Sequence, residues 1–294
     1  MKRAVTLVNK SGGSVADGAA ARIGEVLAAA GIDSEVLLVD GKDCAALAAD
    51  YVKNGVGLLI AAGGDGTMGA IAGELAGTKT VLGILPLGTL NHFARDLGIP
   101  FDLAEAAKAL ATARLRRVDL AEVNGRTFVN NAAIGLYPLM VVDRDAQRHR
   151  LGRSKRLAML VASLRIMARF HARRLKLSAD GQETRVDTPM LFVGNNHYSL
   201  SIPGAGRRET IDAGELSVMV MRSKSLPGFL AATGRALLGT SRTDDMVRLD
   251  GVKLLKVDSA RAHLTLGIDG ESVALAPPLT FRIHPGALTV IAPD

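Results

Sequence analysis

The chain has 294 residues, of which 48% are hydrophobic and 22% are charged, a balance that excludes an intrinsically disordered protein. Its net charge is +7, and its single cysteine, Cys44, permits no intramolecular disulfide, so we expect a reducing, cytoplasmic compartment. No apolar stretch is as long as the roughly 20 residues that a membrane-spanning helix needs. The first apolar run ends at Asn9, which is too short for a signal peptide and fits a first β-strand.

The first third of the chain alternates apolar strands with helices. Continuous apolar strands joined by helices are typical of right-handed βαβ units in a parallel sheet that is covered on both faces. We expect strands over 5–9, 34–40, 56–64 and 80–86, and helices over 16–30, 42–53, 67–75, 90–97 and 103–113.

After residue 117 the pattern changes to strands joined by tight turns such as Asn124-Gly125 and Asp180-Gly181. We expect an α/β fold with a parallel-sheet domain over 1–118, then a mostly antiparallel β domain over 119–294 whose last strand can return to the first domain. The predicted strands lie within 118–135, 173–196, 215–222, 246–260, 262–271 and 279–293, and helices are expected over 154–170 and 226–238.

A glycine-rich loop at residues 63–67, with the sequence GGDGT, follows a buried strand and precedes a helix. Backbone N–H groups at such a junction can face an anion, and glycines let the backbone approach it closely. An acid among the glycines, Asp65, suits phosphoryl transfer assisted by Mg²⁺, and Thr67 suits the helix N-cap. A glycine turn without any ligand is the alternative interpretation.

The same glycines also fit the dinucleotide-binding pattern G-x-G-x-x-G. Two observations oppose that interpretation: Asp65 would repel a bare pyrophosphate, and no acid follows at the spacing that the ribose contact requires. The Walker sequence is also absent. Similar loops end the neighbouring strands at residues 9–13 and 86–98, so the sequence predicts one phosphate-binding crevice at the carboxyl ends of the strands.

Two segments, GGDGT at 63–67 and GTLNHFARDLGIP at 88–100, resemble the catalytic domain of the diacylglycerol kinase and sphingosine kinase superfamily, in its bacterial lipid-kinase branch. The similarity continues through 116–135, 211–221 and 267–293, so it covers nearly the whole chain. It implies an N-terminal domain like those of NAD kinase and phosphofructokinase, a C-terminal β-sandwich, and a cleft between them where ATP and a lipid meet.

The resemblance also implies an activity, the transfer of the γ-phosphoryl group of ATP to a lipid hydroxyl with Mg²⁺. Glu271 is implied as the proton acceptor, Asp65 as the organiser of metal and phosphates, and Asp119 and Asp269 as members of a metal and water network. By its spacing alone, Asp269-Gly270-Glu271 is a plain hairpin turn. The implied nucleotide-binding residues are Asn9, Gly63, Gly64, Asp65, Gly66, Thr67, Gly88, Thr89 and Asn91.

Two residues depart from the family pattern. His92 follows Asn91 where the family usually has an acid, and Asp212-Ala213-Gly214 replaces an Asp-Asp-Gly segment that holds a structural Mg²⁺ in some members. Asp212 is therefore the one candidate ligand for that metal. These departures leave open a catalytically silent nucleotide or lipid sensor, and the shared GGDGT loop leaves open an enzyme like NAD kinase.

A basic segment at residues 144–176 contains 11 Lys and Arg residues and one acid, Asp145. Arg165, Arg169 and Arg173 recur every four residues opposite a stripe of leucines, which predicts an amphipathic helix. A solvated surface helix is one interpretation. The other, which we expect for a lipid kinase, is contact with anionic headgroups that places the protein at the inner membrane surface. Nucleic acid is not an expected partner, because aromatic residues make up only 3% of the chain and Trp is absent.

Overall fold

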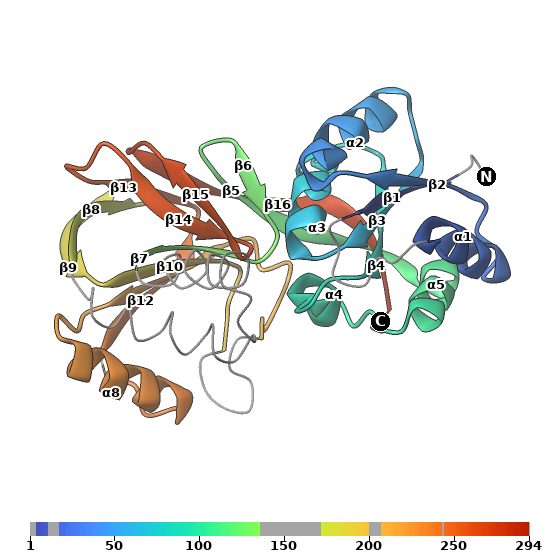
Figure 1. Cartoon of the computed structure of the whole chain (residues 1–294). Coiled ribbons are helices and arrows are strands. Elements are labelled where there is room, and N and C mark those ends of the chain that lie inside the picture. Colours follow the sequence, from blue (N-terminus) through green and yellow to red (C-terminus); the bar gives the residue numbers. More distant parts are fainter. Residues whose placement is uncertain (1–3, 11–17, 136–171, 200–206, 243, 294) are drawn as a thin grey trace, which may run out of the picture.

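The computed structural model describes residues 4–10, 18–135, 172–199, 207–242 and 244–293. The N-terminal strands pair in parallel in the order β2-β1-β3-β4 (Figure 1). The three strands β1, β3 and β4 are apolar and are buried between covering helices, whereas the edge strand β2 is only partly buried. Their bounds are β1 (Ala4–Asn9), β2 (Ser34–Val39), β3 (Leu58–Gly63) and β4 (Val81–Pro86).

Helices cover both faces of these parallel strands. In Figure 1, α1 (Ala19–Ala29) lies beside α5 (Leu103–Thr112) on one side, and α2 (Cys44–Lys53) lies beside α3 (Asp65–Leu75) on the other. Strand β2 is added on one side of β1, and β3 and β4 are added on the other side, so the strand order switches between β1 and β3. Open parallel sheets bind ligands at such a switch point. Two short helical segments complete this half of the chain, a 3₁₀ turn (Gly41–Asp43) and α4 (His92–Asp96).

The C-terminal half consists of two sheets that face each other. One has the strand order β12-β11-β10-β7-β14-β15, and the other continues the parallel sheet through β16-β13-β8-β9. A second apolar core fills the space between them. The bounds are β6 (Arg126–Phe128), β7 (Asn131–Gly135), β8 (Arg173–Ala179), β9 (Gln182–Thr188), β10 (Met190–Asn195), β11 (Leu216–Met221), α8 (Leu226–Leu237), β12 (Met246–Val252), β13 (Leu254–Asp258), β14 (Leu264–Ile268) and β15 (Glu271–Leu275).

Two long strands run from one half of the molecule into the other. The last strand, β16 (Leu279–Ala292), pairs with β13 near its start and with β4 near its end, and it pairs with β5 (Arg114–Val123) along most of its length. On β5, Val118 and Leu120 belong to the first core, whereas Ala121 and Val123 belong to the second. The two cores therefore share continuous backbone.

The predicted fold class is confirmed, because a mostly parallel sheet with helices precedes a β-sandwich. The expected N-cap at Thr67 is wrong: α3 begins two residues earlier and Gly64 occupies the cap position. The helix expected over 90–97 is shorter, because Asn91 adopts the left-handed conformation at φ 49°. The helix expected over 154–170 lies outside the described residues. Among those described, no helix is long and apolar enough to cross a bilayer.

We predict that Phe281→Ala lowers the free energy of unfolding by about 3–5 kcal/mol, because the ring is fully buried on the shared strand β16 and its loss leaves a cavity. Leu115→Ala on β5 is the control, since that side chain is 64% exposed and its loss should cost less than about 0.5 kcal/mol. Urea unfolding measures both changes. Equal unfolding midpoints for the two variants would contradict the placement of Phe281.

Candidate active site

The glycine-rich loops are in direct contact at the carboxyl ends of β3 and β4. A Cβ atom at Gly88 would lie 2.5 Å from Cα of Gly64, so Gly88 has no room for a side chain, and a Cβ at Gly64 would lie 3.3 Å from Cα of Gly88. A Cβ at Gly63 would lie 2.6 Å from Oγ1 of Thr67. From the end of β1, Asn9 donates to the same hydroxyl at 2.8 Å. The end of β1 and the loops after β3 and β4 thus meet at one place, while residues 11–13 of the predicted first loop lie outside the described residues.

Asp65 joins the first of these loops to α4. Its two carboxylate oxygens accept the backbone N–H groups of His92 at 3.0 Å and Phe93 at 2.9 Å, so this carboxylate stabilises the N-terminus of α4. Each oxygen accepts one described hydrogen bond and can accept another. The imidazole of His92 does not share the hydrogen bonds of Asp65, since its Nδ1 pairs with Nη2 of Arg95 at 2.8 Å.

Asn91 shapes its own loop. The side-chain oxygen accepts the N–H of Gly88 at 2.9 Å, and the side-chain nitrogen donates to the carbonyl of Gly88 at the same distance. Asn91 is buried and Thr89 is exposed at the edge of the loop. Both were predicted to bind nucleotide. The structure places Thr89 at the surface, and both side-chain amide atoms of Asn91 bond to the backbone of Gly88.

The β14–β15 hairpin brings the predicted proton acceptor to α3. Asp269 and Gly270 form its two-residue turn, with φ values of 46° and 86°, and Glu271 is the first residue of β15. The side chain of Asp269 turns inward and accepts the N–H groups of Val129, Asn130 and Asn131 at 2.8, 2.8 and 3.1 Å. Asp269-Gly270-Glu271 therefore forms a two-residue hairpin turn and also places the predicted proton acceptor beside α3.

The pKa of Asp269 is raised to about 7, chiefly because burial removes water from the carboxyl group. The three backbone N–H groups act in the opposite direction, since they favour the ionised form, and the nearby carboxylate of Asp65 adds a smaller upward effect. Asp269 thus has the perturbed ionisation that is often found at functional sites. Its hydrogen bonds show that it also holds residues 129–131 in place.

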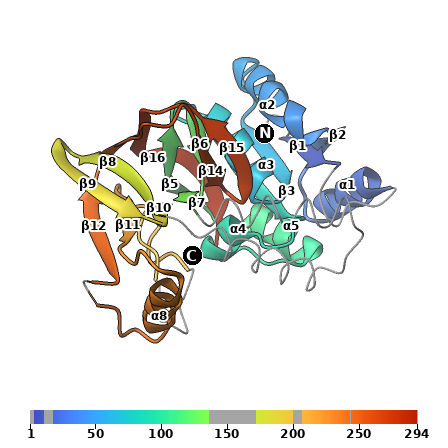
Figure 2. The same ribbon diagram turned by 60° about the vertical axis from the view of Figure 1, so that its left-hand side comes forward.

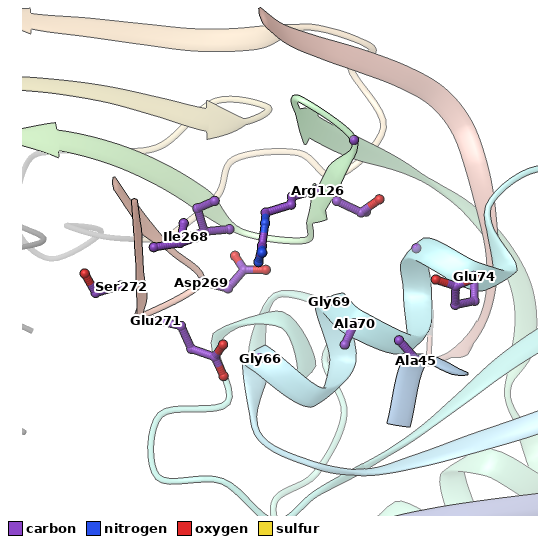
Figure 3. A pocket seen from close by; sticks show the side chains of 14 residues that line it. Ala45, Gly66, Gly69, Ala70, Glu74, Arg126, Ile268, Asp269, Glu271 and Ser272 are labelled. Atoms are coloured by element: carbon purple, nitrogen blue, oxygen red, sulfur yellow. The ribbon is translucent and has the colours of Figure 1, made fainter. Parts of the chain in front are cut away.

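A face of α3 without side chains makes room for this hairpin (Figure 3). A Cβ at Gly66 would overlap the carboxylate of Glu271, and a Cβ at Gly69 would lie 2.8 Å from Oδ2 of Asp269. One turn further along, a Cβ at Gly73 would lie 3.1 Å from Oγ1 of Thr127. The three glycines recur at helical spacing and permit the second half of the molecule to touch α3 along most of its length.

A cavity of about 390 Å³ opens beside these contacts. Figure 3 shows the carboxylate of Glu271 next to Gly66, with the Asp269 turn and Arg126 on the opposite side from α2. Charged, polar and apolar side chains all contribute to the wall, as is usual for small-molecule sites. The lining residues are Ala45, Gly66, Gly69, Ala70, Gly73, Glu74, Gly125, Arg126, Thr127, Ile268, Asp269, Glu271, Ser272 and Val273.

Asp119 lies apart from this cavity and serves as an anchor. Its side chain is 2% exposed and accepts the N–H groups of Gly214 at 2.5 Å and Gly286 at 2.7 Å. The carbonyl of Gly214 accepts a hydrogen bond from Nζ of Lys253 at 2.6 Å. Protein groups therefore hold the loop that contains Asp212.

Residues around Asp212 do not fit a structural metal ion. Asp212 is exposed, and within the described ranges no three His, Cys, Asp or Glu side chains gather to hold a metal. The ammonium of Lys253 instead supplies positive charge at the carbonyl of Gly214. A divalent cation so close to that ammonium would be repelled.

Sequence reasoning missed the buried ion pair between Arg208 and Asp96. Nε of Arg208 lies 2.8 Å from Oδ2 of Asp96, and both side chains are at most 4% exposed. The same guanidinium donates to the carbonyl of Val129 and lies 5.5 Å from the ring centre of Phe93. This pair ties α4 to residues 129–130. Because its members are 112 residues apart, no local pattern could have indicated it.

Comparisons with known proteins agree with this architecture. The family described as diacylglycerol kinase catalytic domain matches residues 3–123, and the one described as YegS C-terminal NAD kinase beta sandwich-like domain matches residues 140–292. A Pseudomonas aeruginosa protein named "Probable lipid kinase YegS-like" is 32% identical over 84% of this chain and 79% of its own length. A Bacillus subtilis protein named diacylglycerol kinase is 26% identical over 75% of this chain and 73% of its own length.

Solved structures show the same fold. A Bacillus anthracis crystal structure named as a candidate diacylglycerol kinase superposes with a TM-score of 0.78 at 26% identity, over 99% of this chain and 97% of that one. Yeast NADH kinase shares the fold more distantly, with a TM-score of 0.55 at 13% identity over 99% of this chain and 84% of its own. The chain belongs to the diacylglycerol kinase catalytic-domain family, with the bacterial lipid kinases of the YegS-like type.

The raised pKa of Asp269 predicts a particular dependence of stability on pH. The pKa of Asp269 is higher in the folded chain than the ordinary 3.8. The contribution of Asp269 to the free energy of unfolding is therefore fully present below about pH 3.8 and is lost as the pH rises through about 7. Asp269→Asn mimics the neutral form at every pH. We expect the wild type to lose stability relative to this variant as the pH rises from about 4 to about 7, as measured by urea unfolding. A difference that is constant with pH would contradict the raised pKa.

A second prediction concerns metal removal. We expect EDTA to leave the melting temperature of the nucleotide-free protein unchanged, because Lys253 holds the Gly214 carbonyl. Lys253→Met should lower the melting temperature by about 2–4 °C, since it leaves that carbonyl without its donor. Lys256→Met, at an exposed position on the following strand β13, is the control. A large drop with EDTA would show that a metal stabilises the loop.

Proposed function

We propose that this protein transfers the γ-phosphoryl group of ATP to a hydroxyl group of a lipid. The observation that carries the proposal is the contact of the Glu271 carboxylate with Gly66, in the first turn of α3. The N-terminus of a helix binds phosphate through its free N–H groups, and a carboxylate beside it can take a proton from an attacking hydroxyl. Family membership supports the reaction class.

The geometry supports a division of roles among the described residues. The triphosphate would lie over the Gly63–Thr67 loop, with Gly88 close enough to contribute its own backbone. The cavity beside α3 would hold the rest of the nucleotide, since its volume of about 390 Å³ opens next to Gly66 and Glu271. In this arrangement Glu271 stands at the end of the phosphate chain, where an acceptor hydroxyl must arrive.

The reaction then balances as an in-line displacement. The lipid oxygen forms a bond to the γ-phosphorus, the bond from that phosphorus to the bridging oxygen of ADP breaks, and the hydroxyl proton moves to Glu271. Mg²⁺ fits here as a companion of the nucleotide and would neutralise phosphate charge. Asp65 would hold it through the remaining acceptor sites of its carboxylate, directly or through water.

The acceptor is proposed to be a lipid alcohol, such as diacylglycerol or a sphingoid base, met at an anionic membrane surface. The basic segment 144–176 was predicted to contact that surface, and most of it lies outside the described residues. Of its basic residues, Arg173, Arg174 and Lys176 are described and begin β8. Nucleic acid is not proposed as a partner.

A catalytically silent nucleotide or lipid sensor is the second candidate. The hydrogen bonds of Asp65 to α4 and of Asn91 to its own loop favour it, because these side chains then have a structural role that does not require catalysis. A sensor would bind ATP but would transfer nothing. An enzyme like NAD kinase, which shares the fold, would instead phosphorylate NAD.

Transfer of labelled γ-phosphate from ATP–Mg²⁺ to lipid alcohols in anionic mixed micelles tests the proposal, with NAD as a second acceptor. We expect a labelled lipid from the wild type, and at least a 100-fold lower rate from Glu271→Gln, since loss of a general base commonly costs 10²–10⁴. ATP binding by Glu271→Gln, measured by calorimetry, should be unchanged. Label on NAD, or ATP binding without transfer to any acceptor, would overturn the lipid-kinase proposal.

A further inference from the structure

Helix α8 (Leu226–Leu237) connects β11 to β12 and has an exposed face without charge. Three of its leucines face solvent: Leu230 is 48% exposed, Leu237 is 40% exposed and the C-cap residue Leu238 is 76% exposed. Figure 2 shows the helix at the end of the molecule away from the parallel strands. Surface helices of soluble proteins ordinarily carry polar side chains on their exposed side, so this face is unusual.

The polar side chains of Thr233 and Arg235 on α8 bond to other groups of the protein. The one charged residue of the helix, Arg235, forms an ion pair with Asp245, with Nε 2.7 Å from Oδ2. The hydroxyl of Thr233 donates to the carbonyl of Phe229 at 2.9 Å. Only Ala232 is fully buried. The helix is therefore anchored by Arg235 and leaves its leucines uncovered by the described part of the chain.

The exposed leucines are not an instance of scattered surface hydrophobics. The other large apolar side chains exposed among the described residues are dispersed over β2, β5 and two loops near α4. Single exposed apolar residues of that kind need no explanation, whereas a contiguous apolar patch marks an interaction site. They are Leu38, Leu90, Phe101 and Leu115.

Basic side chains flank the apolar face at both ends of the helix. Arg222 and Lys224 precede α8, and Arg242 follows it; all three are exposed. Lys224 lies 3.4 Å from Asp187, whereas no ion pair with a described residue engages Arg222 or Arg242. An apolar helix face bordered by Lys and Arg is typical of helices that lie in the plane of a membrane interface.

An open groove beside the helix strengthens the charge argument. It has a volume of about 690 Å³ and lies between the C-terminal half of α8 and β12. Among the described residues, Arg222, Arg242 and Arg248 line it together with one acid, Glu209. Arg248 is already engaged by Asp250 at 2.7 Å, so Arg222 and Arg242 supply the available charge. A concave surface with an excess of guanidinium groups fits a phosphate-bearing headgroup.

We propose that α8 docks the protein on an anionic lipid bilayer, with Leu230, Leu237 and Leu238 among the acyl chains and Arg222 and Arg242 at the headgroup phosphates. This inference rests on the proposed function, because an enzyme that phosphorylates a membrane lipid must reach the bilayer. The charge around the helix selects a lipid surface over a second copy of this chain, whose matching face would bring the same arginines together.

Vesicle binding of the full chain tests the docking surface. We expect the wild type to sediment with phosphatidylcholine vesicles that contain 30% phosphatidylglycerol, and less with phosphatidylcholine alone. The double variant Leu230→Glu/Leu237→Glu should bind the anionic vesicles at least tenfold more weakly. Arg222→Gln/Arg242→Gln should bind them several-fold more weakly and should show a reduced dependence on salt. Leu115→Glu, at an exposed leucine on β5, is the matched control and should bind like the wild type.

Equal binding of the anionic vesicles by the wild type and the leucine double variant would overturn the proposal. A wild-type dimer in size-exclusion chromatography that the leucine variant converts to a monomer, with vesicle binding unchanged, would assign this face to a second copy instead.

The docking proposal and the kinase proposal can fail independently of each other. A short-chain diacylglycerol dissolved as monomers should be phosphorylated equally by the wild type and the α8 variants, and Glu271→Gln should bind vesicles normally. Vesicle binding that follows the α8 leucines without phosphorylation of any lipid would retain the docking surface and overturn only the kinase proposal.

Discussion

The glycine face of α3 controls how closely the two halves of the molecule approach. Gly66, Gly69 and Gly73 leave no Cβ atoms where the β14–β15 turn and Thr127 pack. Because of this close approach, a carboxylate from the C-terminal half, Glu271, reaches the N-terminal turn of a helix in the other half. A Cβ atom at Gly66 would displace the carboxylate of Glu271, the proposed base, from the first turn of α3.

The rest of the structure fixes that approach from both sides. Asp269 binds three consecutive backbone N–H groups at residues 129–131, so the turn cannot move independently of the β6–β7 connection. Asp65 holds α4 on the side of the parallel sheet, and the shared strands β5 and β16 run through both cores. Contacts of this kind preorganise a site, as the proposed phosphoryl transfer would require.

Much of the fold was predictable because it follows from local patterns. Apolar runs such as 56–64 predicted buried strands, and Asn124-Gly125 and Asp180-Gly181 predicted hairpins, since only residues tolerant of positive φ fit those turns. The GGDGT loop was also found correctly at the end of a strand. The N-cap was misplaced at Thr67 because a polar residue was preferred there, whereas Gly64 begins the helix.

Other features of the site could not be predicted, because they depend on contacts between residues distant in sequence. Nothing around Asp269 indicates that its side chain turns inward to the backbone at 129–131, and nothing around Lys253 indicates its bond to Gly214. The buried pair of Arg208 with Asp96 is of the same kind. The role of Asp65 at α4 likewise needed the structure, since sequence spacing pointed only to a ligand.

The most direct test of this account is the rate of γ-phosphate transfer by Gly66→Ala, compared with Gly24→Ala on α1. The added methyl at Gly66 overlaps the Glu271 carboxylate, whereas a methyl at Gly24 would lie 3.7 Å from Val36, an ordinary contact. We predict that Gly66→Ala remains folded and lowers kcat by at least about 100-fold, as loss of a positioned base would. Gly24→Ala should keep full activity. A wild-type kcat for Gly66→Ala would contradict the claim that the glycine face positions Glu271 for catalysis.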